Sequence, residues 1–203
     1  MKVENLTYRS EIYTSNVYLL MGDWNTMEDL NTLIDVGRDP SILEKIDNAS
    51  TGVGKQRVQQ VVLTHNHYDH ASLLPVIKKT YNPKVLAASS NLACVNIILK
   101  GGEMLRIADR EFEVIYTPGH SNDSICLYCE EEKVIFIGDT PLVIMANDNT
   151  YGEVFINVLE YIAAKRIETI YFGHGEPLKV NCKKMLLNSL ENVKNQNLQC
   201  KKM

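Results

Sequence analysis

All five histidines of this chain fall in three short segments of a kind typical of metal binding. Three lie in one run, Thr64-His65-Asn66-His67-Tyr68-Asp69-His70, which also contains a carboxylate. The other two are His120, in T-P-G-H-S, and His174, in F-G-H-G, and Asp139 lies between them in G-D-T. Imidazole and carboxylate groups are ligands that zinc and other borderline first-row metals prefer. The pattern therefore indicates a metal centre.

The run from His65 to His70 offers four ligand side chains within six residues. Side chains alternate along an extended backbone, so His65, His67 and Asp69 can share one side, with His70 following where the backbone turns. One metal takes about four ligands, and four from so short a run cannot easily share one ion. Two divalent ions, ~3.5–4 Å apart as in other two-metal sites, fit better. Further ligands are then available from His120, Asp139 and His174.

Flanking patterns predict which elements position these residues. The apolar run Val58–Leu63 predicts a buried strand before the histidines, and Leu73–Tyr81 predicts a helix with Pro75 in its first turn. The run thus lies at a strand's carboxyl end, where α/β sheets place ligands. Further strands are expected at 3–9 and 11–20, joined by a tight turn, and at 30–36, 84–87 and 168–172, with four more between 103 and 137. Further helices are expected at 40–48, 90–98, 153–165 and 179–198. Thr150 and Glu153 predict a capping box for the helix at 153–165.

In this order, H-x-H-x-D-H, T-P-G-H-S, G-D-T and G-H-G resemble the metallo-β-lactamase superfamily. The early segment Leu33-Ile34-Asp35-Val36-Gly37 is similar to that family's "IDxG" strand end, and the resemblance extends from about Val17 to about Pro177. It implies a four-layer αββα sandwich, an α/β fold, formed here by residues 1–203 as a single domain. It also implies two groups of metal ligands. The first comprises His65, His67 and His120; the second comprises Asp69, His70 and His174, with Asp139 between the two groups.

The resemblance implies a hydrolase with a dinuclear metal centre and a metal-bound hydroxide, which Asp69 would orient. We expect two divalent ions, zinc foremost, with iron or manganese as alternatives because such ligand sets accept all three. The pattern is most similar to the small glyoxalase II-like branch, which cleaves thioesters such as hydroxyacylglutathione. A full glyoxalase II adds a C-terminal helical domain that holds glutathione, whereas residues 175–203 suffice for about one helix. The expected substrate is therefore a small molecule, a thioester or a related acyl ester or lactone.

An alternative function comes from the same fold. Persulfide dioxygenases keep H-x-H-x-D-H while using a single iron, so a mononuclear iron oxidoreductase stays open. A non-catalytic member is less consistent with the sequence, because such members usually lose ligands and this chain keeps all seven.

Three positions have two interpretations each. Asp139 could bridge two metals or only cap a turn after the strand at 134–137. Asp35 could orient a ligand histidine or only cap the next helix. The segment Thr140–Tyr151 could form one wall of the substrate pocket, with Met145 or Tyr151 touching an acyl group, or only a buried turn and helix cap.

Composition agrees with a globular protein that contacts neither nucleic acid nor membrane. Hydrophobic residues make up 45% of the chain and the net charge is −4, without a basic arm for nucleic acid. No apolar run reaches the length of a membrane span, and the N-terminus lacks the apolar core of a signal peptide. The five cysteines show no disulfide-scaffold pattern, which favours a cytoplasmic location. Cys126 and Cys129 should face opposite sides of a strand, so this C-x-x-C is not expected to bind metal.

Overall fold

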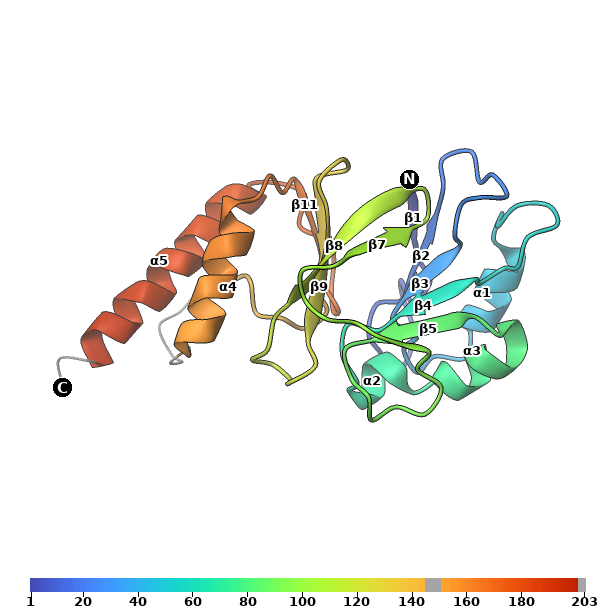
Figure 1. Cartoon of the computed structure of the whole chain (residues 1–203), viewed down its shortest axis with the longest axis horizontal. Helices are drawn as coiled ribbons and strands as arrows, with labels where there is room; N and C mark the ends of the chain where they lie inside the picture. The colour runs from blue at the N-terminus through green and yellow to red at the C-terminus, as the bar shows by residue number, and fades with distance from the viewer. Residues whose placement is uncertain (145–150, 201–203) are drawn as a thin grey trace.

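Two β-sheets lie face to face, and helices cover the outer face of each sheet (Figure 1). The computed structural model describes residues 1–144 and 151–200, with side chains described up to residue 195. Within these residues no helix is both long and apolar enough to span a bilayer. The layer order helix, sheet, sheet, helix is the expected αββα sandwich.

The first sheet has six strands in the order β1-β2-β3-β4-β5-β6. β1, β2 and β3 pair antiparallel, whereas β3 to β6 pair parallel. Parallel strands need crossover connections. Helices form those from β3 to β4 and from β4 to β5, whereas turns join β5 to β6. The strands are β1 (Lys2–Asn5), β2 (Tyr18–Met21), β3 (Thr32–Ile34), β4 (Gln60–Val62), β5 (Lys84–Ala87) and β6 (Ile97–Ile98). The crossover helices are α1 (Ile42–Asn48), α2 (Tyr68–Ala71) and α3 (Leu74–Tyr81).

The second sheet has five strands in the order β11-β10-β9-β8-β7. β7 to β10 pair antiparallel, and β11 joins β10 in parallel after the crossover helix α4. These strands are β7 (Met104–Ile107), β8 (Arg110–Tyr116), β9 (Ile125–Cys129), β10 (Val134–Phe136) and β11 (Thr169–Tyr171). The outer helices on this side are α4 (Glu153–Ala164) and α5 (Cys182–Cys200).

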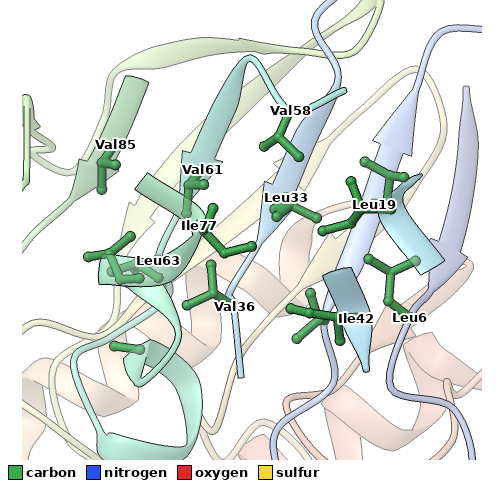
Figure 2. Packing of buried hydrophobic residues seen from close by; sticks show 14 of the residues in the cluster. Leu6, Leu19, Leu33, Val36, Ile42, Val58, Val61, Leu63, Ile77 and Val85 are labelled. Carbon is green, nitrogen blue, oxygen red and sulfur yellow. The ribbon is translucent and has the colours of Figure 1, made fainter. Parts of the chain in front are cut away.

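Alternation along the strands distributes apolar side chains among three cores. On β2, Leu19 faces α1 and α3 while Leu20 faces the second sheet. Figure 2 shows the outer core of the first sheet, where Leu33 and Val61 lie in one cluster with Ile42 and Ile77. Fully burying one such side chain stabilises the fold by roughly 1.5–3 kcal/mol.

The same alternation confirms the prediction for the cysteine pair. Cys126 lies in the core between the second sheet and α4, and Cys129 lies in the core between the two sheets. Both are buried free thiols. They cannot converge on one metal ion.

The helix predicted for residues 90–98 is wrong. This segment forms turns and then the short edge strand β6, which pairs with β5. Asn96 fixes the change, because its backbone N–H donates to Val85 O at 2.8 Å and its side-chain oxygen accepts from Val85 N–H at 2.9 Å. Ile97 and Ile98 are β-branched and suit a strand. Pairing with an open sheet edge thus overrode the local pattern.

The tight turn predicted between the first two strands is also wrong. β1 ends at Asn5 and β2 begins at Tyr18, so residues 6–17 form a long connection. Thr7 holds this connection together: its hydroxyl donates to Ser15 O at 3.0 Å and accepts from Val17 N–H at 2.9 Å. Side-chain bonds therefore replace the backbone ladder that a hairpin would have.

The helix starts were predicted with mixed success. Pro75 lies in the first turn of α3, as expected. α4 begins at Glu153 with Gly152 as its N-cap and without a side-chain capping bond. Thr150, the other half of the predicted capping box, lies outside the described residues.

Candidate metal centre

The residues singled out by the sequence follow the ends of four strands. The run from His65 follows β4 in the first sheet. His120, Asp139 and His174 follow β8, β10 and β11 in the second sheet. These three strands run in the same direction, because β8 and β10 are each antiparallel to β9 and β11 is parallel to β10. Their carboxyl ends therefore meet at one edge, where α/β sheets form binding sites.

The run itself turns earlier than predicted. His67 is the N-cap of α2 in an extended conformation, and the helix begins at Tyr68. Asp69 is therefore already helical and does not share a side with His65 and His67. Instead it groups with His70, Asp139 and His174. The prediction for Asp69 was wrong because it needed an extended backbone through Asp69, whereas the extended segment ends two residues earlier, at His67.

All seven predicted ligand residues lie together, in two groups. Within each group, one potential ligand atom from every member lies within 4.8 Å of the others. The groups are His65, His67 and His120, and Asp69, His70, Asp139 and His174.

Asp139 lies between the two groups. Its Oδ2 is 3.6 Å from His120 Nε2 and 3.5 Å from His174 Nε2, and its Oδ1 is 3.3 Å from His70 Nε2. A carboxylate that only capped a turn would not need to touch histidines from both groups. The carboxylate thus lies within 3.6 Å of histidines from both groups.

Several imidazole nitrogens at the centre have no hydrogen-bond partner among the described residues. They are the buried Nε2 atoms of His65, His70 and His174. The His174 nitrogen is 3.0 Å from Asp69 Oδ2, but without hydrogen-bond alignment. By contrast, His67 Nδ1 and His120 Nε2 share a hydrogen bond of 2.9 Å, whose donor depends on the tautomers. Unpaired buried polar atoms are costly, and a shared cation would satisfy them, so the residues present fit a metal centre.

Burial and neighbouring charges shift the pKa values of the proposed ligands in different directions. Burial, reinforced by the nearby His70, lowers the pKa of His65 to about 4 and keeps its imidazole neutral, the form that binds metal. Burial opposes charge on His70 as well, but Asp35 and Asp139 raise its pKa to about 10. Although burial opposes it, the neighbouring imidazoles of His174 and His70 lower the pKa of Asp139. The Asp139 carboxylate therefore stays ionised.

Asp35 orients a histidine rather than capping a helix. His70 Nδ1 donates to Asp35 Oδ2 at 2.8 Å, which directs Nε2 of the same ring into the centre. Asp35 Oδ1 accepts the backbone N–H of Thr64 at 2.8 Å, and Oδ2 accepts the Thr64 hydroxyl at 2.8 Å. The carboxylate is buried, and both of its oxygens accept hydrogen bonds. A carboxylate behind a histidine is the usual support of a metal-binding imidazole.

Gly173 permits the close approach of the two sheets' ligands. A Cβ at this position would lie 2.2 Å from Asp139 Oδ1 and 2.8 Å from His70 Cε1. Any larger residue would push the carboxylate and the imidazole apart. This glycine therefore belongs to the geometry of the centre.

Sequence reasoning missed two residues of the 6–17 connection. Asn16 donates its side-chain amide to Phe172 O at 2.9 Å and Gly175 O at 2.8 Å, which fixes the loop that carries His174. Tyr13 stacks on the His174 ring, with centroids 5.3 Å apart and planes inclined by 14°. The charge of Asp69 raises the pKa of Tyr13. Neither residue has a distinctive motif; only its place in the fold shows its contact with the centre.

A cavity of about 320 Å³ opens beside the centre, lined in part by His120, Asp139 and His174. Its remaining wall includes Pro141, Leu142, Val143 and Phe172, so the first part of the segment 140–151 does face this space. Tyr151 stacks on Phe155 at 5.0 Å, and Phe155 lies against Gly119 beside His120. Met145 lies outside the described residues.

The sequence profile of the metallo-beta-lactamase superfamily matches residues 13–93 and 99–174. The chain belongs to the metallo-beta-lactamase superfamily. A curated relative, the cytoplasmic isozyme of hydroxyacylglutathione hydrolase from Saccharomyces cerevisiae, is 32% identical over 151 residues, 69% of this chain and 53% of the relative. The hydroxyacylglutathione hydrolase of Francisella tularensis subsp. novicida is 35% identical over 88 residues, 42% of this chain and 35% of the relative. The chain thus matches about half of the length of the yeast relative and about a third of the length of the Francisella relative.

Solved structures agree on the fold. ETHE1 from Myxococcus xanthus superposes with a TM-score of 0.66 at 20% identity, over 95% of this chain and 88% of that one. A metallo-beta-lactamase family protein from Thermus thermophilus gives a TM-score of 0.66 at 19% identity, over 98% of this chain and 79% of that one. At this identity the likeness concerns the αββα architecture alone.

Proposed function

We propose that the protein is a metal-dependent hydrolase that acts on a thioester or a related acyl ester or lactone. The observation that carries the proposal is the convergence of five histidines and two carboxylates with buried, unpartnered nitrogen atoms. The named activity of two curated relatives, hydroxyacylglutathione hydrolase, supports the choice of an acyl bond.

Two divalent cations, with zinc foremost and iron or manganese as alternatives, would be held by the two groups. His65, His67 and His120 would hold the first. Asp69, His70 and His174 would hold the second, with Asp139 shared. When bound, such ions lower the pKa of a water molecule and polarise a carbonyl oxygen.

The protein's own residues would orient the reactants. Asp69 lies within reach of His174 and is half-buried, so its carboxylate would accept a hydrogen bond from the attacking water and hold that water in place. Asp35 keeps the His70 ring fixed during the reaction. The apolar wall at Pro141 to Val143 would receive the acyl group and exclude bulk water around the scissile bond.

Metal analysis together with a substrate screen tests this proposal. The protein is purified without added metal, its zinc, iron and manganese are measured, and turnover is assayed with thioesters, lactones and phosphodiesters. Two equivalents of zinc with thioester or lactone turnover would support the proposal. One iron per chain with oxygen uptake and no ester turnover would refute it and favour the dioxygenase alternative.

A cytoplasmic location belongs to the same proposal. It is consistent with the buried free thiols Cys126 and Cys129 and with the name of the yeast relative. Separating the cell's compartments and detecting the native protein in each would test it.

A further inference from the structure

A second cavity adjoins the metal centre on the side of His174. It has a volume of about 430 Å³ and is bounded by the connection between β1 and β2, from Asn5 to Asn16, and by Gly175 and Glu176. Gly175 directly follows the proposed ligand His174. His174 thus lines the first cavity, and the residue after it lines the second.

Tyr13 joins the cavity to the centre. One face of its ring stacks on His174, while 69% of the residue is exposed and lines the cavity. A molecule with its reactive bond at the metals could extend across this ring into the second cavity. An aromatic surface suits such a passage because it contacts both apolar and polar groups.

The cavity carries two opposite charges that do not neutralise each other. Arg9 and Glu176 both line it, yet neither forms an ion pair with any residue that the structure describes. The Arg9 guanidinium instead lies over the Tyr8 ring, 5.1 Å from its centroid. That contact fixes the stem of the arginine and leaves its N–H groups available to a carboxylate.

The backbone at Arg9 supports a role for the side chain. Arg9 has a φ of 61° in a turn closed by the bond from Ser10 N–H to Thr7 O, a conformation that glycine adopts more readily. Strained residues of this kind cluster at binding sites. Glycine would adopt this turn with less backbone strain than arginine.

We infer that this cavity binds a zwitterionic amino-acid group on the thiol portion of the substrate, with its carboxylate at Arg9 and its ammonium at Glu176. The inference rests on the proposed thioester hydrolysis. It places recognition of the leaving group in the connection between β1 and β2, within the catalytic unit itself.

Binding of S-methylglutathione, which carries such a group and cannot be hydrolysed, tests the cavity directly. Isothermal titration calorimetry on the full-length, metal-loaded protein should show binding that weakens about five-fold in Arg9→Gln, as expected for the loss of one exposed charge contact. Arg9→Gly should weaken it similarly while folding at least as stably, because glycine relieves the turn. Arg57→Gln, in a different cavity, is the matched control and should bind normally.

The ammonium contact has its own test. N-acetylation of S-methylglutathione removes the positive charge and should weaken binding to the unmodified protein about five-fold. In Glu176→Gln the acetylated and free forms should bind equally. An Arg9→Gln affinity equal to that of Arg57→Gln, or an acetylation effect unchanged by Glu176→Gln, would overturn the inference.

Kinetics separate this inference from the proposed function. A hydroxyacyl thioester of uncharged N-acetylcysteamine probes the metal centre alone, whereas the glutathione thioester probes both sites. We expect Arg9→Gln to raise KM about five-fold for the glutathione thioester only, with kcat unchanged. Hydrolysis of both thioesters with no effect of Arg9→Gln would reject the cavity and keep the hydrolase; hydrolysis of neither would reject the hydrolase.

Discussion

The two sheets contribute to the metal centre in different ways. The first sheet supplies four proposed ligands from one run of six residues after β4, where α2 folds them together locally. The second sheet supplies three from three separate strand ends, His120, Asp139 and His174. The first set is organised by a single turn of the backbone; the second depends on the whole sheet and on its docking against the first. Removing residues from each set tests this difference.

Loss of a ligand from the first sheet should have the largest effect. His67→Ala and Asp69→Ala should each abolish hydrolysis and release at least one metal, because each removes a ligand that neighbours cannot replace. Metal content by mass spectrometry and turnover on the best substrate are the measurements. Asn66→Ala, in the same run but directed at Ser89, is the control and should keep both. Two metals with near-native turnover in either ligand variant would refute the assignment.

Loss of the shared ligand from the second sheet should follow. Asp139→Asn keeps the shape but removes the negative charge facing both groups, so both metals should bind more weakly and activity should fall at least ~100-fold, several kcal/mol of metal-based stabilisation. Metal titration and melting temperature are measured together. A turn cap alone would cost ~1 kcal/mol with metals intact. Asp109→Asn, in an ion pair with Arg110, serves as the charge control.

Substitution of Asp35 tests whether the proposed ligand His70 needs the carboxylate that holds its ring in place. Asp35→Asn leaves one carbonyl oxygen where two carboxylate oxygens now accept from His70 and Thr64. Metal affinity should fall roughly 10–100-fold, the usual effect of losing such support. Competition with a metal chelator measures it. Asp39→Asn, which removes a buried acid bonded to Ser10 and Ser41, should lower the melting temperature and leave metal affinity unchanged. Equal affinities in both variants would contradict the role of Asp35.

The smallest effect is expected at the edge of the cavity. Tyr151→Ala should change substrate preference a few-fold without changing metal content, because Tyr151 stacks on Phe155, which lies against Gly119 beside His120. The measurement is kcat/KM across the substrate screen. Tyr161→Ala, on α4 and bonded to Glu113, is the control. Relative kcat/KM values across the screen equal to those of the unmodified protein would argue against a wall role. The same prediction holds for Met145→Ala, although Met145 lies outside the described residues.

Much of the fold was predictable because its signals are local. Apolar runs set strands such as β4 and β5, and Pro75 marked the start of α3. The cysteine pair followed from alternation alone. The predictions failed where distant partners decide the conformation: Val85 draws residues 96–98 into the sheet, and Thr7 holds the long connection that replaces a tight turn.

For the site, the sequence alone determined which residue types could bind metal and in what order they occur, since ligand chemistry resides in the side chains. Tertiary structure decided their grouping, because α2 begins at Tyr68 and turns Asp69 away from His65. It also decided that Asp35 supports His70 and that Tyr13 and Asn16 contact the His174 loop. These contacts join residues far apart in the chain. Pairing of β3 with β4 brings Asp35 to His70, whereas packing of one sheet against the other brings Tyr13 and Asn16 to the His174 loop.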